Sequence, residues 1–145
     1  MNLPALRFST AALLRGLAAE QWSDTDVRAA SLLPDWTRGH VLTHIARNAD
    51  GIALTLSGAL RGEVLARYPH GRQGRAADIE AGACRSAAEL LADVNESAER
   101  LDRTYAAVAD ADGWELPTDD QHPTSAWILA RWQEVEIHRV DLGGA

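Results

Sequence analysis

The sequence predicts an all-α protein whose fold is a four-helix antiparallel bundle. Apolar residues recur every three, four or seven positions in four long segments, and this spacing places them on one face of a helix. The segments between them are polar or contain proline and glycine, and none is a convincing strand. Alanine, a strong helix former, occupies 27 of the 145 positions. Amphipathic helices joined by short connections are typical of a bundle.

The first two helices are expected over residues 6–20 and 37–61. A connector over residues 23–36, interrupted by Pro34, separates them, and Thr37 is suited to cap the second helix. The expected core stripe of the first helix consists of Leu6, Thr10, Leu13 and Leu17. The expected stripe of the second consists of Val41, Ile45, Ala49, Ile52 and Leu56.

The third helix is expected over residues 76–108, after a loop over residues 62–74 that contains proline and glycine. Its stripe has the most regular spacing and consists of Ile79, Ala83, Ala87, Leu90, Val94, Leu101 and Tyr105. The loop before it is long enough to cross over one end of the bundle. A strict up-and-down order of the helices therefore stays open.

The last helix is expected to follow a polar connector over residues 110–123. Thr124 or Ser125 is suited to cap its first turn, and the helix is expected to end at Leu142, where two glycines follow at positions 143–144. Ile128, Trp132 and Val135 define its core direction.

Composition limits the function classes open to the chain. With a net charge of −7, it lacks the basic character of a nucleic-acid-binding protein. No apolar run approaches the ~20 residues of a membrane-spanning helix, and the N-terminus does not resemble a secretory signal. Cys84 is the single cysteine, so no internal disulfide is expected, which suits a reducing cytoplasm. The length fits one domain, expected over residues 1–145.

Polar side chains follow one edge of the apolar stripe on the second helix. At 100° per residue, His44, Asn48 and Thr55 all lie within about 60° of Val41, on the same side. A buried asparagine needs hydrogen-bond partners, and a site between helices would supply them. His40 lies further toward solvent. A histidine at the edge of a core can also be held there by a hydrogen bond alone.

On the last helix, Glu134 and His138 are four residues apart, so one turn places them on the same flank of the stripe. Arg131 and Trp127 line that flank as well. A glutamate and a histidine at this spacing can bind one divalent ion. A histidine from a facing helix would complete the three-ligand set common in catalytic zinc sites. The same pair is also common as a surface ion pair, so the spacing leaves both interpretations open.

The remaining chemically active side chains are less informative. His70 and His122 lie in expected loops, where solvated histidines are common. Cys84 lies beside the stripe of the third helix, and a packing role is favoured over a nucleophilic one. The five tryptophans are expected to pack in the core and at helix ends.

Three segments resemble one family, and together they extend over nearly the whole chain. The first, residues 33–50, reads LPDWTRGHVLTHIARNAD, and the second, residues 75–83, reads RAADIEAGA. The third, residues 131–143, reads RWQEVEIHRVDLG. All three are similar to segments of the mycothiol-dependent maleylpyruvate isomerase family, whose metal-binding N-terminal domain belongs to the DinB-like superfamily of four-helix bundles.

The resemblance implies that His44, Glu134 and His138 bind a metal, zinc or another divalent ion. It also implies mycothiol as cosubstrate. All 14 basic residues are arginine, and this bias, together with the alanine content, fits a GC-rich genome such as those of the actinobacteria that make mycothiol. The family's isomerases continue into a C-terminal domain, which we expect to be absent from this chain, either because the chain is a fragment or because it is a single-domain relative with another thiol-transfer function.

The implied function is a mycothiol-dependent isomerase or S-transferase. Two neutral imidazoles and one carboxylate leave a zinc site with a net charge of about +1, which favours a bound thiolate as nucleophile. In the isomerase the thiolate adds to a cis double bond and leaves after rotation, whereas in a transferase it stays attached to the electrophile. Arg75, with Arg72 as the alternative, is the candidate for holding a carboxylate of the substrate or thiol. Asn48 and Asp141 are candidates for orienting the ligands, and Asn48 is, with Arg75, also a candidate for cofactor binding. For Asp141, an ion pair at the helix end is an equal alternative.

The expected partners are a small-molecule thiol and a small electrophilic substrate, with no nucleic acid and no membrane. A homodimer stays open. The alternative function is a non-catalytic metal-binding or sensory helical bundle, in which a fourth protein ligand closes the site. His40 is the nearest spare ligand for such a site. A helical interaction module without metal is a third interpretation.

Overall fold

The computed structural model describes residues 2–118 and 122–143, and it confirms the all-α fold class. In this part of the chain there is no β-sheet, and only two isolated β-bridges occur, one joining Ala30 to Thr37 and one joining Pro117 to Pro123. The helices are α1 (Leu3–Ala19), α2 (Asp24–Arg28), α3 (Arg38–Leu60), α4 (Gly71–Ala83), α5 (Ala87–Asp110) and α6 (Ala126–Asp141).

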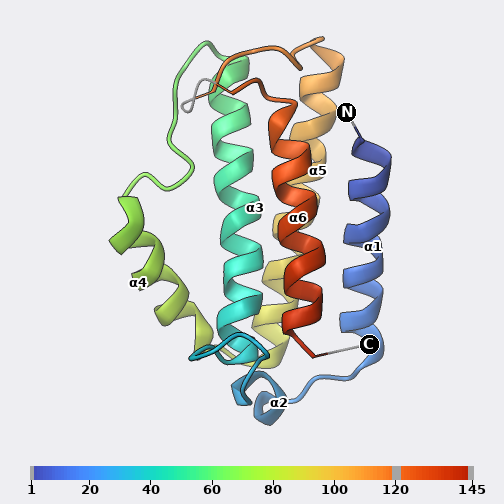
Figure 1. Ribbon diagram of the computed structural model, residues 1–145, viewed down its shortest axis with the longest axis vertical. Coiled ribbons are helices and arrows are strands. Elements are labelled where there is room, and N and C mark those ends of the chain that lie inside the picture. The colour runs from blue at the N-terminus through green and yellow to red at the C-terminus, as the bar shows by residue number, and fades with distance from the viewer. Residues whose placement is uncertain (1, 119–121, 144–145) are drawn as a thin grey trace.

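The four long helices α1, α3, α5 and α6 form the bundle (Figure 1). The chain runs along α1 and α6 in one direction and along α3 and α5 in the other. The segment after α3 and the helix α4 bring the chain back along the outside, so α3 and α5 are parallel neighbours with the most extensive contact in the molecule. Facing helices α3 and α6 are antiparallel, and this pair carries the candidate site.

The expected apolar stripes form the core. All five stripe residues of α3 are fully buried, and the leucines of α1 at positions 6, 13 and 17 are buried as well. Ile128 and Val135 complete the core from α6, as their helical spacing predicts. Thr10 and Trp132 are exceptions, because both are only half-buried, and Thr10 lies at the edge of a cleft between α1 and α5.

The expectation of one helix over residues 76–108 is wrong. The chain ends α4 at Ala83 and begins α5 at Ala87, and its apolar stripe is nevertheless buried on both sides of the break. The new helix starts at Ser86, which forms a capping box. The Ser86 side chain accepts from the backbone N–H of Glu89, and the Glu89 carboxylate accepts from the backbone N–H of Ser86.

Two other expected boundaries also shift. The loop expected over residues 62–74 is shorter, because α4 already begins at Gly71, where the positive φ of 70° suits glycine. The connector over residues 23–36 contains the short helix α2, which starts with a capping box between Ser23 and Asp26. Residues 119–121 of the last connector and Gly144, expected after the last helix, lie outside the described residues.

Close backbone contacts fix α4 and the preceding segment against α3. A Cβ on Gly39 would collide with the carbonyl oxygen of Ala83, so the C-terminal end of α4 packs directly on the first turn of α3. Further along, a Cβ on Gly51 would lie 2.6 Å from the carbonyl oxygen of Arg67. These contacts hold the segment that carries Arg67 and Arg75 beside the middle of α3.

The N-terminal ends of α3 and α6 differ in whether a side chain caps them. Thr37 caps α3, as expected, in a capping box with His40. Ser125 is the N-cap residue of α6, but its side chain makes no capping hydrogen bond, and the Thr124 hydroxyl donates to the carbonyl oxygen of Gly113.

Among the described helices, none has the length and apolar character needed to cross a membrane.

Candidate metal centre

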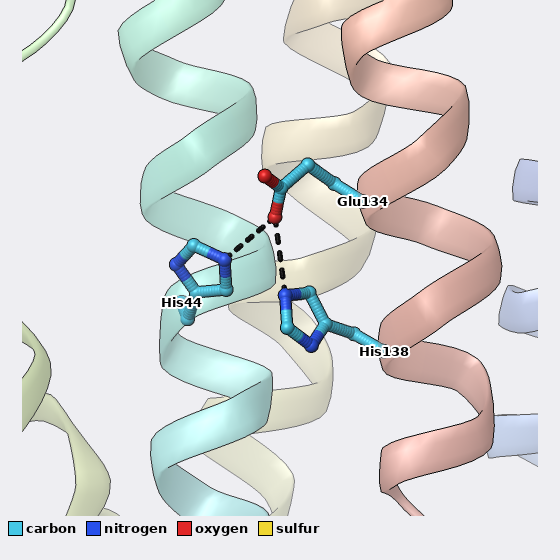
Figure 2. Close-up of side chains that lie close together, drawn as sticks. All are labelled: His44, Glu134 and His138. Carbon is cyan, nitrogen blue, oxygen red and sulfur yellow. Dashed lines mark hydrogen bonds and ion pairs between the residues drawn. The ribbon is translucent and has the colours of Figure 1, made fainter. Parts of the chain in front are cut away.

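Three side chains converge between α3 and α6, as Figure 2 shows. His44 projects from α3, and Glu134 and His138 project from α6. The Oε2 atom of Glu134 lies 2.7 Å from Nε2 of His44 and 3.1 Å from Nε2 of His138. One potential ligand atom from each of the three residues lies within 4.8 Å of the other two, close enough for a single ion to bridge them.

Local helix geometry brings this set together. Glu134 and His138 are one turn apart on α6, so their side chains stack on one flank. His44 lies beside the core stripe of α3 and is buried, the side chain of His138 is mostly buried, and Glu134 is half-buried. The imidazole rings of His44 and His138 meet edge to face with their centroids 4.6 Å apart. The set therefore lies at the rim of the core, where it is shielded from solvent on the His44 side.

The tautomer of His44 follows from its two neighbours. Nη2 of Arg75 lies 2.9 Å from Nδ1 of His44, and a guanidinium can only donate. Nδ1 must therefore accept, and the remaining proton lies on Nε2, which donates to Glu134. Burial lowers the pKa of His44, although the hydrogen bond to Glu134 opposes this effect. His44 is thus a neutral imidazole.

His138 is held between two carboxylates. Its Nδ1 lies 2.9 Å from Oδ2 of Asp141, and its Nε2 faces Glu134, so both ring nitrogens donate. Burial by itself lowers the pKa of His138, but the hydrogen bonds to Glu134 and Asp141 and their negative charges raise it above its ordinary value. Asp141 thus contacts His138 directly, and its role in orienting a metal ligand stays a prediction. A carboxylate on the outer nitrogen of a histidine is typical of metal-binding histidines.

Glu134 accepts hydrogen bonds from both histidines. These bonds, of which the one from His138 has the larger effect, lower the pKa of Glu134 well below its usual range. Its carboxylate is therefore ionised at any pH near neutrality. Two imidazole nitrogens and one carboxylate oxygen match the donor set that zinc takes in catalytic sites. The residues present thus fit a divalent metal of the zinc type.

His40 does not join this set. Its Nδ1 lies 2.7 Å from the Thr37 hydroxyl, and its Nε2 lies 3.0 Å from Oε2 of Glu80. The indole ring of Trp36 stacks on His40 and meets the ring of His44 at its edge. In the described part of the chain, the cluster of potential metal ligands contains only the three expected residues.

Arg75 connects the site to a neighbouring cleft of about 180 Å³ between α3 and the segment that leads into α4. Arg67 and Tyr68 also line this cleft, and the guanidinium carbons of Arg67 and Arg75 lie 4.9 and 5.4 Å from the centroid of the Tyr68 ring. Neither arginine forms an ion pair with a described carboxylate. Arg72, the alternative to Arg75, is exposed and does not line the cleft.

Sequence reasoning missed Arg67. It lies in the loop after α3, where an arginine gives no periodic signal, and only the close approach permitted by Gly51 places it in the cleft. Asn48, expected to assist cofactor binding, is buried and accepts a hydrogen bond from Arg131 through its Oδ1 at 2.9 Å. This contact turns that oxygen toward Arg131, and a role for Asn48 in cofactor binding stays a prediction.

The fold and the site define a class of protein: a helical-bundle domain with a candidate metal centre of two histidines and one glutamate contributed by facing helices. The chain belongs to the family described as the mycothiol maleylpyruvate isomerase N-terminal domain, whose model matches residues 3–143. No curated protein matches the sequence significantly.

Two solved structures are similar to this chain. One is a crystal structure of the mycothiol-dependent maleylpyruvate isomerase, and the other is of a variant of that enzyme with one histidine replaced by alanine. Each superposes with a TM-score of 0.89 at 28% sequence identity and covers 99% of this chain. This chain spans 60% of the length of each of those proteins.

Proposed function

We propose that this domain is the metal- and thiol-binding unit of an enzyme that uses mycothiol for isomerisation or for transfer to a small electrophile. The observation that carries the proposal is the convergence of His44, Glu134 and His138 within 4.8 Å in a member of this family. The name of the similar solved enzyme suggests mycothiol and maleylpyruvate as the first thiol and electrophile to try.

His44, Glu134 and His138 would hold the ion. A divalent metal held there would lower the pKa of a thiol at its open position and so supply a thiolate nucleophile at neutral pH. His40 is engaged by Thr37 and Glu80, so the residue best placed to close the site as a fourth ligand is already occupied. This arrangement supports a catalytic site over a closed structural one.

Arg75 has a role that depends on metal loading. To bind a metal through Nε2, neutral His44 must carry its proton on Nδ1. Nδ1 then has no lone pair for Arg75, and the two donors face each other at the present 2.9 Å. We infer that Arg75 leaves His44 when a metal binds. Its guanidinium is then available to hold a carboxylate in the cleft that it already lines.

The electrophile expected in this cleft is an anion. Arg67 and Arg75 bring two positive charges to the same Tyr68 ring, while Arg47 and Asp50, which also line the cleft, pair with each other at 3.1 Å. Asp78 also lines the cleft and limits the excess of positive charge. A substrate with one or two carboxylates, such as a keto acid with a cis double bond, fits this small excess of positive charge.

The decisive experiment measures zinc content and thiol-dependent turnover on the same protein. The wild-type chain should bind one zinc ion and consume maleylpyruvate, or a general thiol acceptor, only when mycothiol is present. His44→Ala should lose both properties and remain helical by circular dichroism. His122→Ala is the matched control, because His122 lies in an exposed loop away from the site. If the chain binds stoichiometric zinc but turns over neither type of electrophile, the enzyme proposal is refuted in favour of a non-catalytic metal-binding bundle.

A further inference from the structure

A second cleft, of about 300 Å³, opens between α1 and α5 on a part of the molecule that the proposed function does not use. Its walls are mainly apolar and include Leu6 and Leu14 from α1 and Ala98 and Leu101 from α5. These two helices make only light contact with each other, since α1 packs chiefly on α6. The volume lies at the lower end of the range for small-molecule sites.

Arg131, from α6, also lines this cleft, although its side chain is only 2% exposed. Its Nη1 donates to the carbonyl oxygen of Ile45 at 2.8 Å and to Oδ1 of Asn48 at 2.9 Å. These contacts fix the guanidinium and engage one of its three nitrogens. No carboxylate of the described residues forms an ion pair with it. A buried cation without an ion-pair partner is costly, so the cleft ends at a site that favours an anion.

Arg131 keeps its charge at neutral pH. Burial lowers the pKa of Arg131 to about 10, and nearby groups, including the Tyr105 hydroxyl and Glu134, act in the opposite direction. Tyr105 itself lines the cleft, but its hydroxyl donates to the carbonyl oxygen of Trp127 at 3.1 Å. The arginine is thus the charged group available at the inner end of the cleft.

The charged residues at the outer edge are already paired. Arg7 donates to Asp102 across the cleft at 2.6 Å, and both side chains are about half exposed. Glu99 lies 3.9 Å from Arg103 on the same helix. The outer edge therefore carries balanced charges, and an incoming anion meets its unpaired cation only at Arg131.

We propose that the cleft between α1 and α5 binds a small amphipathic monocarboxylate, with its carboxylate on Arg131 and its hydrocarbon part between the two helices. The apolar walls exclude a strongly hydrated anion such as phosphate, and the single buried guanidinium matches one carboxylate. The lining of this cleft contains none of the three candidate metal ligands. The proposal can therefore be tested without the thiol chemistry.

The proposal is tested first by the charge of the ligand. Octanoate and 1-octanol have the same chain length, so their difference in affinity, measured by calorimetry, isolates the carboxylate. We expect octanoate to bind the wild-type chain at least tenfold more tightly than octanol. We also expect binding to shift the amide resonances of α1 and α5 and the Nε–H resonance of Arg131 in NMR spectra. Arg131→Met should abolish the preference for octanoate.

A pair of variants on α1 tests the proposal even if Arg131→Met fails to fold. Ala11→Phe places a bulky ring in the cleft, whereas Ala12→Phe makes the same change on the adjacent, similarly half-buried position, which lines another surface. Octanoate affinity should fall at least tenfold in Ala11→Phe and stay within twofold in Ala12→Phe. Equal binding of octanoate and octanol, or unchanged octanoate binding in Ala11→Phe, would overturn the proposal, and neither measurement requires zinc.

Discussion

At the scale of single residues, the candidate metal centre is a continuous chain of hydrogen bonds from Arg75 through His44, Glu134 and His138 to Asp141. Each member constrains the proton on the next. Arg75 can only donate and the two acids only accept, so His44 is neutral and His138 carries both protons. A metal bound to Nε2 of both histidines would displace the two Nε2 protons, so the Arg75 contact at one end would be lost, whereas Nδ1 of His138 would still donate to Asp141 at the other end.

The first prediction concerns Arg75→Met. Removing the guanidinium frees Nδ1 of His44 to carry a proton and removes a positive charge 2.9 Å from a metal-ligand ring. Zinc should therefore bind roughly tenfold more tightly, equivalent to about 1.4 kcal/mol, while KM for an anionic electrophile rises. Competition with a zinc chelator measures the affinity. Arg72→Met, on the exposed neighbour, should change neither quantity, and weaker zinc binding in Arg75→Met would refute the inferred release.

The second prediction concerns protons. Zinc must displace the Nε2 proton of His138, whereas His44 only moves its proton from Nε2 to Nδ1, so loading should release about one proton in total. Because the pKa of His138 is raised, the proton competes with zinc at and above the ordinary histidine pKa of about 6.5. Affinity should rise with pH through this region. Calorimetry in buffers of different ionisation enthalpy counts the protons, and a value near zero would contradict the assignment.

At the scale of elements, the break between α4 and α5 determines where the crossover packs. Gly82 lies against Thr43 of α3, where a Cβ would come within 2.5 Å of the threonine methyl group. Arg85 forms an ion pair with Asp93 in the second turn of α5. The two helices therefore meet α3 at a bend, and α4 continues along the outside of the bundle with Arg75 facing His44.

The third prediction tests the capping box that begins α5. Ser86→Ala removes the side chain that accepts from the N–H of Glu89, and loss of such a cap costs about 1 kcal/mol of unfolding free energy. Ser125→Ala is a matched control, because Ser125 occupies the N-cap position of α6 without a capping hydrogen bond. Urea denaturation should show a lower midpoint for Ser86→Ala and a nearly unchanged one for Ser125→Ala. Equal effects would mean that the cap does not stabilise α5.

At the scale of the whole molecule, the candidate site joins α3 to α6 through His44 and Glu134, which are 90 residues apart in the sequence. A metal that bridges them binds the folded chain and not the unfolded one. Its binding energy therefore adds to the stability of the entire bundle. The α1–α5 cleft lies elsewhere in the bundle, between two helices that make only light contact with each other.

The fourth prediction is a zinc-dependent rise in stability. At free zinc about 100 times its dissociation constant, the unfolding free energy should increase by about 2.7 kcal/mol, and chelation should reverse the change. Thermal unfolding monitored by circular dichroism at constant protein concentration measures it. His44→Ala should remove most of the increase, and His122→Ala should keep it. An equal rise in both variants would place the stabilising ion elsewhere.

The sequence by itself determined the helical fold class, the core stripes and the pairing of Glu134 with His138. These features depend on spacing within one helix, which the 3.6-residue repeat fixes locally. It also contained the signal for the α4–α5 break, since Ser86 and Glu89 have the spacing of a capping box, but the regular apolar stripe across the break outweighed that signal. The proposal of His44 as the third ligand required the family resemblance as well as its place at the edge of a stripe.

Only the tertiary structure decided which distant groups meet. The contact of Arg75 with His44, the place of Arg67 in the cleft and the engagement of His40 by Glu80 all join separate elements. Arg131 is the clearest case, because helical spacing put it on the flank with Glu134 and His138, whereas the structure buries it against Ile45 and Asn48. A helix repeat specifies the direction of a side chain, but its neighbours and its burial depend on which helix packs there.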